Sequence, residues 1–161
     1  MNAKKKGNNF ERESAKILSL IVSEGKTDIV FWRTAGSGNF ATINKSKYQK
    51  GDLCVINPEY PNTKLAFECK NLSKVYLFPI HRKIKEIIDE CEYKYGNNWV
   101  ILLKISNIGT YALSRIDIFS NNLEAIINYE GYKLNIYIFN KNTELNREEY
   151  EKYREGNGHN I

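Results

Sequence analysis

Lys64-Leu65-Ala66-Phe67-Glu68-Cys69-Lys70 is the stretch that decides the fold of this chain. It reads as a β-strand, and Leu53 to Ile56 before it reads as another, with turn residues from Pro58 to Asn62 between them. The simplest arrangement is an antiparallel hairpin. Residues two apart on a strand face the same side, so Glu68 and Lys70 project together while Cys69 faces the core. Antiparallel pairing also brings Asp52 near Glu68.

Two neighbouring carboxylates point to a metal site at this end of the hairpin. They repel one another unless a cation or a proton lies between them. Hard oxygen ligands suit Mg²⁺, which often adds a backbone carbonyl, here that of Cys69, and keeps several waters. Such a metal would lower the pKa of a bound water, and Lys70 could orient or deprotonate that water. Asp52, Glu68 and Lys70 are therefore candidate catalytic residues.

The elements on either side indicate a mixed α/β fold, in which a central sheet is flanked by helices. The spacing of apolar residues predicts a helix from Asn8 or Asn9 to Ser23 and another from Ile80 to Cys91 that stops before Gly96. A short helix is expected near Asn122 to Asn128. The remaining strands are expected at Ile29 to Trp32, Trp99 to Leu103, Tyr111 to Leu113 and Tyr132 to Phe139. The continuous apolar run Trp99 to Leu103 indicates a strand buried on both faces.

Glu11 extends the candidate site to the first helix. It is in line with Ser14, Ala15, Leu18 and Val22, so it faces the sheet rather than water. A carboxylate in that position needs a partner. Its neighbour Glu13 falls on the other side of the helix and is expected to be solvated.

Composition limits the other possibilities. A chain of 161 residues with 42% hydrophobic residues fits one globular domain, and we divide it into a domain over 1–139 and a polar, charged tail over 140–161, partly helical or disordered. Its apolar runs are too short to cross a bilayer, which predicts a cytoplasmic protein. The three cysteines are expected to be reduced core residues. A zinc site is disfavoured because the chain has two histidines, His81 and His159.

Positive charge is concentrated in the first half of the chain. Residues 1–83 hold 15 Lys/Arg against 7 Asp/Glu, a net +8, whereas residues 84–161 hold 9 against 12, a net −3. An excess of this kind favours phosphate contacts with nucleic acid, although a solvated lysine-rich surface would look the same. The long segment from Arg33 to Gly51, with its Gly-Ser-Gly and three lysines, is expected to be a loop that is either functional or disordered.

The motifs together resemble the PD-(D/E)xK nucleases, and among them the archaeal and phage Holliday junction resolvases. The resemblance covers about the first 105 residues. It is carried by Lys6-Gly7-Asn8-Asn9-Phe10-Glu11-Arg12-Glu13, Trp32-Arg33-Thr34-Ala35-Gly36-Ser37-Gly38, Gly51-Asp52-Leu53 and Phe67-Glu68-Cys69-Lys70. It implies a restriction-endonuclease-like core, cleavage of DNA four-way junctions and a homodimer. Gly51 departs from the family pattern, which has proline there, and the loop from Gly36 to Gly51 is longer than a minimal resolvase needs.

The resemblance also implies roles for single residues. Glu11, Asp52, Glu68 and Cys69 would hold Mg²⁺, for which Mn²⁺ would substitute, and Glu11, Asp52, Glu68, Lys70 and Ser37 would be catalytic. The expected DNA-binding residues are Lys5, Lys6, Arg33, Ser37, Lys45, Lys47 and Lys50.

Two other functions fit the same residues. One is a phage or mobile-element nuclease that acts on duplex DNA, and the other is a DNA-binding module that keeps the fold without catalysis. If these residues have only structural roles, Asp52 would be a turn cap, and Glu68 and Lys70 would form a cross-strand salt bridge. An exposed salt bridge contributes only about 0 to 1 kcal/mol to folding stability.

Overall fold

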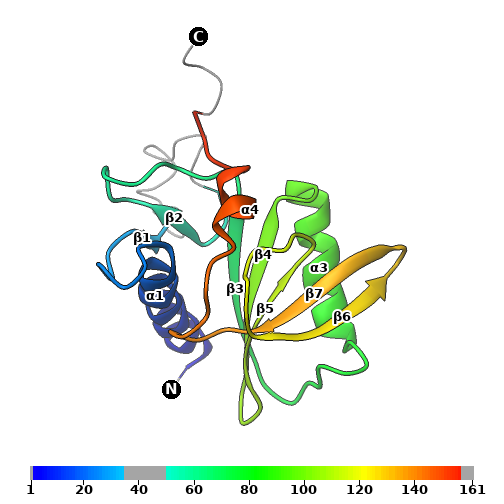
Figure 1. Cartoon of the computed structure of the whole chain (residues 1–161). Helices are drawn as coiled ribbons and strands as arrows, with labels where there is room; N and C mark the ends of the chain where they lie inside the picture. The colour runs from blue at the N-terminus through cyan, green and yellow to red at the C-terminus, as the bar shows by residue number, and fades with distance from the viewer. Residues whose placement is uncertain (1, 35–49, 157–161) are drawn as a thin grey trace.

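The computed structural model describes residues 2–34 and 50–156, and within them a seven-stranded mixed sheet carries a helix on each face (Figure 1). In the order β1-β2-β3-β4-β5-β7-β6, only β3 and β4 are parallel. The predicted α/β fold, a restriction-endonuclease-like core with a central mixed sheet, is confirmed. The strands are β1 (Phe31–Arg33), β2 (Leu53–Val55), β3 (Ala66–Leu72), β4 (Trp99–Ile105), β5 (Gly109–Ser114), β6 (Leu123–Tyr129) and β7 (Tyr132–Ile138).

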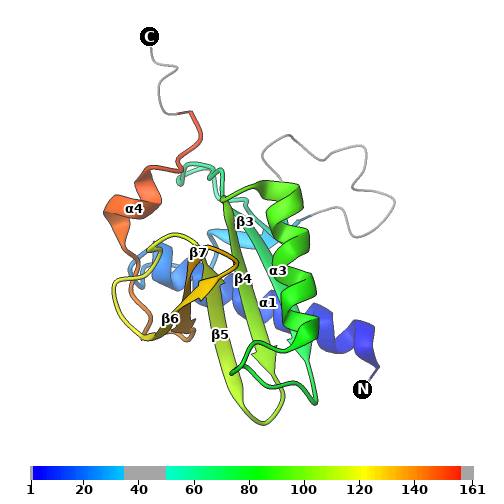
Figure 2. The ribbon, with the colours of Figure 1, turned by 90° about the vertical axis from the view of Figure 1, so that its right-hand side faces the viewer.

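The parallel pair is joined by α3 (Arg82–Tyr95), which crosses from the end of β3 to the start of β4. His81 caps the start of α3, because its Nδ1 accepts from the Lys83 N–H at 3.0 Å. Gly96, with φ of 62°, ends it. The helix predicted from Ile80 therefore has the expected position and begins two residues later. Figure 2, turned by 90°, shows α3 and α1 on opposite faces of the sheet.

Two apolar layers form the core, one on each face of the sheet. The first packs α1 (Ala3–Val22) through Leu18 and Ile21 against the sheet, and the second packs α3 through Ile84 and Ile88. Alternate residues of β4 belong to each layer, so this strand is buried on both faces as its continuous apolar run predicted. All three cysteines are buried, as expected for core residues.

The first helix begins earlier than the apolar spacing predicted. Asn2 caps it by accepting the Lys5 N–H at 2.8 Å, so the helix runs from Ala3 and includes Lys4, Lys5 and Lys6. A start at Asn8 or Asn9 is therefore wrong. An Asn cap two residues from the chain start is sufficient to begin a helix, whereas the apolar stripe begins only at Phe10.

The helix predicted near Asn122 to Asn128 is also wrong, because this segment is strand β6. Ala125, Ile127 and Tyr129 face the second core layer while the residues between them are exposed, which is the two-residue period of a strand. Glu130 and Gly131 then turn with φ of 49° and 92°, the signs that a two-residue hairpin requires. Antiparallel pairing with β7 decides the conformation.

The end of the described chain packs on the first core layer. Helix α4 (Arg147–Glu151) lies in the tail that was expected to be partly helical, and its Tyr150 is buried in that layer. The Lys64 N–H donates to the Tyr153 carbonyl at 2.6 Å, which ties α4 to the residues before β3. The division of the chain after residue 139 stays a prediction. Within the described ranges, no helix is both long enough and apolar enough to span a membrane.

Candidate active site

The β2–β3 hairpin places Asp52 against the middle of β3, as predicted. Leu53 pairs with Phe67, and the Asp52 N–H donates to the Phe67 carbonyl at 2.7 Å. One step further along β3, the Cys69 N–H donates to Asp52 Oδ2 at 2.8 Å. The backbone thus holds both ends of Asp52 at the point where β2 begins.

Gly51 explains how the chain enters this position. Its φ is 71°, and a Cβ at this residue would lie 2.6 Å from the Phe67 carbonyl oxygen. A side chain would therefore collide with the backbone of β3, and proline cannot adopt this φ. The departure from the family's proline is thus required by the path of this chain.

Glu68 lies between a carboxylate and a phenol. The Tyr95 hydroxyl, at the end of α3, donates to Glu68 Oε1 at 2.7 Å. Burial raises the pKa of Glu68 to about 7, assisted by the charge of Asp52 and a hydrogen bond between the two carboxyl groups, while Tyr95 and Lys70 oppose the shift. At neutral pH Glu68 therefore carries a proton for much of the time. A cation bound beside Asp52 and Glu68 would offset the same repulsion.

Tyr95 was missed from the sequence, although a signal for it existed. The apolar stripe of α3 contains Ile84, Ile88 and Cys91, and Tyr95 is four residues beyond Cys91 on the same face. That face packs on the sheet surface from which Glu68 projects. Extending the stripe by one turn would have placed Tyr95 there.

Lys70 and Glu68 face the same side of the sheet, as their spacing predicted. Together with residues of α3 they line a cavity of about 30 Å³, which is room for a water molecule or two. Cys69 points to the opposite side and is buried in the first core layer. Burial raises the pKa of the Cys69 thiol well above its usual value, so its side chain stays protonated and only its backbone remains as a ligand.

The donor set fits a hard divalent cation. Asp52 and Glu68 provide carboxylate oxygens, and the Cys69 carbonyl points to the same strand edge as the Cys69 N–H that Asp52 accepts, because both groups of one strand residue lie on one side. Across residues 2–34 and 50–156, no three His, Cys, Asp or Glu side chains are gathered closely enough to hold an ion. Two side-chain carboxylates are thus in place here, and the third predicted ligand lies elsewhere.

That third residue, Glu11, forms an ion pair with Arg33. Arg33 Nε is 2.7 Å from Glu11 Oε1, with both side chains 20% exposed, and Arg33 Nη2 donates to Asn8 Oδ1 at 2.9 Å. Glu11 therefore faces the sheet as predicted and has a partner. Helix α1, which carries Glu11, packs on the Cys69 side of β3, and the charge of Glu11 contributes to the raised pKa of the Cys69 thiol. The metal-binding role of Glu11 stays a prediction.

The residues predicted to bind DNA are only partly within the described chain. Arg33 lies at the end of β1 and is engaged by Glu11, and Lys50 is exposed just before Gly51. Lys5 is exposed on α1, and Lys6 Nζ donates to Ser106 Oγ at 3.1 Å. Ser37, Lys45 and Lys47 lie outside the described residues.

A mixed sheet with this strand order, carrying an Asp, a Glu and a Lys at the junction of two strands, defines a nuclease of the PD-(D/E)xK class. Nucleases of this class usually use divalent metal ions. The family model described as "Phage putative PDDEXK endonuclease" matches residues 2–152, so the chain belongs to this family. No curated protein and no solved structure matches the chain.

Proposed function

We propose that this protein is a Mg²⁺-dependent DNA endonuclease whose metal is held by Asp52, Glu68 and the Cys69 carbonyl, with Mn²⁺ as an effective substitute. The observation that carries the proposal is the position of Asp52, which the Phe67 carbonyl and the Cys69 N–H hold beside Glu68, and the raised pKa of Glu68 agrees with it. Two acids that the fold holds side by side are a ready site for a divalent cation. A structural salt bridge between Glu68 and Lys70 would not require Asp52 to be there.

Bound at this position, the metal would supply an activated water and stabilise negative charge at the phosphate. Lys70 lies beside the small cavity and orients the attacking water through its ammonium group. Glu68 releases its proton to solvent when it becomes a ligand, and the Tyr95 hydroxyl holds Glu68 Oε1 in place.

Arg33 and Glu11 couple DNA binding to the site. A guanidinium binds carboxylate and phosphate with the same two-pronged geometry, so a DNA phosphate can replace Glu11 as the partner of Arg33. Glu11 is then available to the metal from the α1 side. Ser37 acts near the scissile phosphate, and Lys5, Lys6, Lys45, Lys47 and Lys50 contact the backbone of the DNA.

For the substrate we propose branched DNA, with four-way junctions cut by a homodimer. The order and spacing of the motifs, which resemble those of the resolvases, support this choice. The alternative substrate is linear duplex DNA, and the match to a phage endonuclease family gives it support of its own. The intact set of two acids and a lysine argues against a DNA-binding module without catalysis.

A cleavage assay on matched substrates distinguishes a nuclease for branched DNA from a nuclease for linear duplex DNA. The same sequences are assembled as a four-way junction and as linear duplexes and incubated with the protein and Mg²⁺. Paired, symmetric nicks confined to the junction are expected. Equal cutting of the duplexes would exclude the resolvase and leave the nuclease.

A further inference from the structure

The segment between β3 and α3 combines exposed aromatic rings with an unbalanced positive charge. Residues 71–85 contain four Lys/Arg and no Asp/Glu. Tyr76 is 54% exposed and Phe78 is 50% exposed. Buried and exposed residues alternate here: Val75 and Leu77 are anchored in the second core layer, while Lys74, Tyr76 and Phe78 are exposed.

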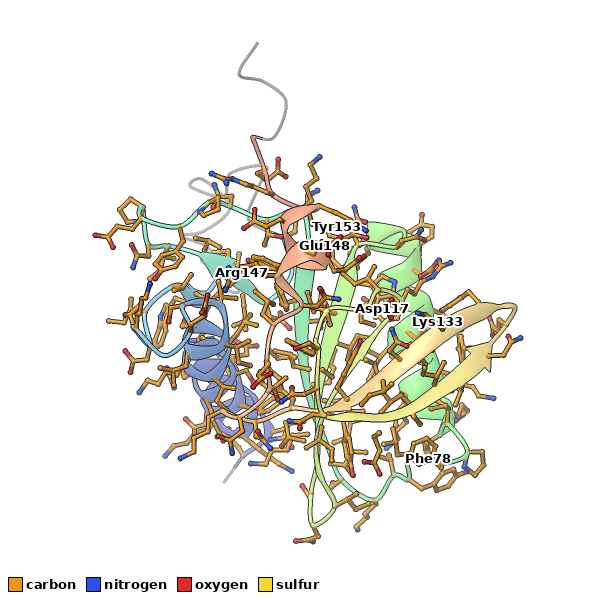
Figure 3. All side chains as sticks on the ribbon, in the orientation of Figure 1. Phe78, Asp117, Lys133, Arg147, Glu148 and Tyr153 are labelled. Carbon is orange, nitrogen blue, oxygen red and sulfur yellow. The ribbon has the colours of Figure 1, made fainter. Side chains whose placement is uncertain are left out.

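The Tyr76 ring is held in place by its surroundings. The Tyr76 ring packs edge to face on His81, with 4.7 Å between centroids, and His81 is itself fixed as the cap of α3. Phe78 stands on the outer side of the loop, at the lower edge of the molecule (Figure 3). A ring that is already fixed loses little freedom when a flat ligand stacks on it.

The positive charges of this segment have no carboxylate partner within the described residues. Lys74, Arg82, Lys83 and Lys85 are exposed, and every ion pair of the described chain lies elsewhere. Other exposed cations, such as Lys94 and Lys133, are paired with acids. Unpaired cations next to exposed aromatic faces are the arrangement that binds a nucleic-acid strand, with phosphates on the cations and bases on the rings.

We propose that residues 74–83 form a stacking platform for unpaired bases of a DNA strand. Bases inside a duplex present only their edges, so half-exposed rings can stack only on bases that are already unpaired. The platform directly follows the strand that carries Glu68 and Lys70. Tyr76 is six residues beyond Lys70, and a fully extended chain of that length spans at most about 20 Å. A DNA strand with a rise of about 3.4 Å per nucleotide covers that distance with roughly six nucleotides.

This inference rests on the proposed function, because it assigns the single-stranded part of the substrate to the same nuclease. A branch, a flap or an opened junction supplies such bases beside a duplex, and a continuous linear duplex does not. The platform would therefore bias the site toward structured DNA.

The test compares fluorescence anisotropy of one labelled oligonucleotide, alone and annealed to its complement, with chelator present so that no cleavage occurs. The double variant Tyr76→Ala, Phe78→Ala is expected to weaken single-strand binding by about 10- to 100-fold or more and to leave duplex binding within about threefold. Tyr93→Ala is the matched control, because Tyr93 is 91% exposed on α3 outside the platform. It should change neither affinity by more than about twofold.

The charge contribution has its own readout. Arg82→Ala with Lys83→Ala should lower the slope of log affinity against log salt by about 0.7 for each lost phosphate contact with a single strand. The aromatic variant should leave that slope unchanged. Melting temperatures and sedimentation coefficients are measured for every variant.

Three results would overturn the platform: single-strand affinity unchanged in the aromatic variant, equal losses on single strand and duplex, or a change of sedimentation coefficient without DNA, which would make this surface a protein interface. The proposed function fails differently. If wild-type protein binds single strands through Tyr76 and Phe78 but cuts no DNA with Mg²⁺ or Mn²⁺, the platform stands and the endonuclease does not.

Discussion

Asp52 and Glu68 meet at the β2–β3 junction, where burial, together with the charge of Asp52 and a hydrogen bond to it, raises the pKa of Glu68 to about 7. The same Asp52 accepts the Cys69 N–H at 2.8 Å and Glu68 Oε1 accepts the Tyr95 hydroxyl at 2.7 Å, so neither acid can move away without breaking a hydrogen bond. Repulsion between the two carboxylates is therefore a fixed property of the fold. A proton or a divalent ion must offset it.

Metal binding should consequently release a proton. At pH 6 Glu68 is mostly protonated, and binding of Mg²⁺ or Mn²⁺ is expected to expel close to one proton and to strengthen about tenfold for each pH unit until it levels off near pH 8. Isothermal titration calorimetry in two buffers of different ionisation enthalpy measures the number of protons released for each metal ion bound. Glu68→Gln should weaken metal binding and abolish the proton release. Proton release that is unchanged in Glu68→Gln would assign it to another group.

Without metal, the stability of the protein should fall as pH rises. Because the folded pKa of Glu68 is raised above its ordinary value of 4.5, the folded state binds more protons than the unfolded state between pH 4.5 and about 7. This contribution is fully present below pH 4.5 and is lost through pH 7. After allowance for solvent screening it amounts to about 1 to 2 kcal/mol. Urea unfolding with chelator at pH 5 and pH 8 measures it.

In that comparison Glu68→Gln should remove the difference between the two pH values, since the neutral amide does not titrate. Glu124→Gln is the control, because Glu124 is exposed on the edge strand β6. A decline that persists in Glu68→Gln would contradict the assignment.

Tyr95→Phe should move the pH dependence of cleavage to higher pH. The Tyr95 hydroxyl stabilises ionised Glu68, so its removal raises the pKa of Glu68 further and lowers activity below pH 7 by about 3- to 10-fold. Activity at pH 9 should be much less affected. Tyr93→Phe, on the same helix but exposed, serves as the control. Equal losses at pH 6.5 and pH 9 would indicate a purely structural role for Tyr95.

Gly51→Ala should cost about 2 to 4 kcal/mol of folding free energy. The added Cβ would meet the Phe67 backbone at 2.6 Å and would also impose a side chain on a φ of 71°. Gly25→Ala isolates the second effect, because Gly25 has φ of 81° and nothing within 4 Å of the added carbon. Its expected cost is about 1 kcal/mol. Denaturant unfolding measures the loss of folding free energy in both variants. Equal losses would show that the close approach at Gly51 does not constrain the hairpin.

The sequence predicted the part of the site that local geometry controls. Strand alternation places Glu68 and Lys70 together, and antiparallel pairing brings Asp52 to them, so both features follow from short-range rules. The ion pair of Glu11 with Arg33 joins residues 22 positions apart, and its geometry depends on how α1 lies on β1. Nothing in the spacing of either residue reveals it.

Strand β6 shows the same limit for the fold. Residues 122–128 have enough apolar character for a short helix or a strand, and only the hairpin with β7 selects the strand. The start of α1 depended on a single cap, Asn2, outside the apolar stripe that indicated the helix. Tertiary pairing and caps therefore explain both differences.

The central claim is that Asp52 is a metal ligand required for cleavage, and rates of DNA cleavage by Asp52→Asn with Mg²⁺ or Mn²⁺ test it most directly. Asp117→Asn is the matched control, since Asp117 is paired with Lys133 at the surface, away from the β2–β3 junction (Figure 3). Asp52→Asn should lose about 100- to 1000-fold in rate and still bind DNA, while Asp117→Asn keeps wild-type rates. Cleavage by Asp52→Asn within about tenfold of wild type would contradict the metal site proposed for this fold.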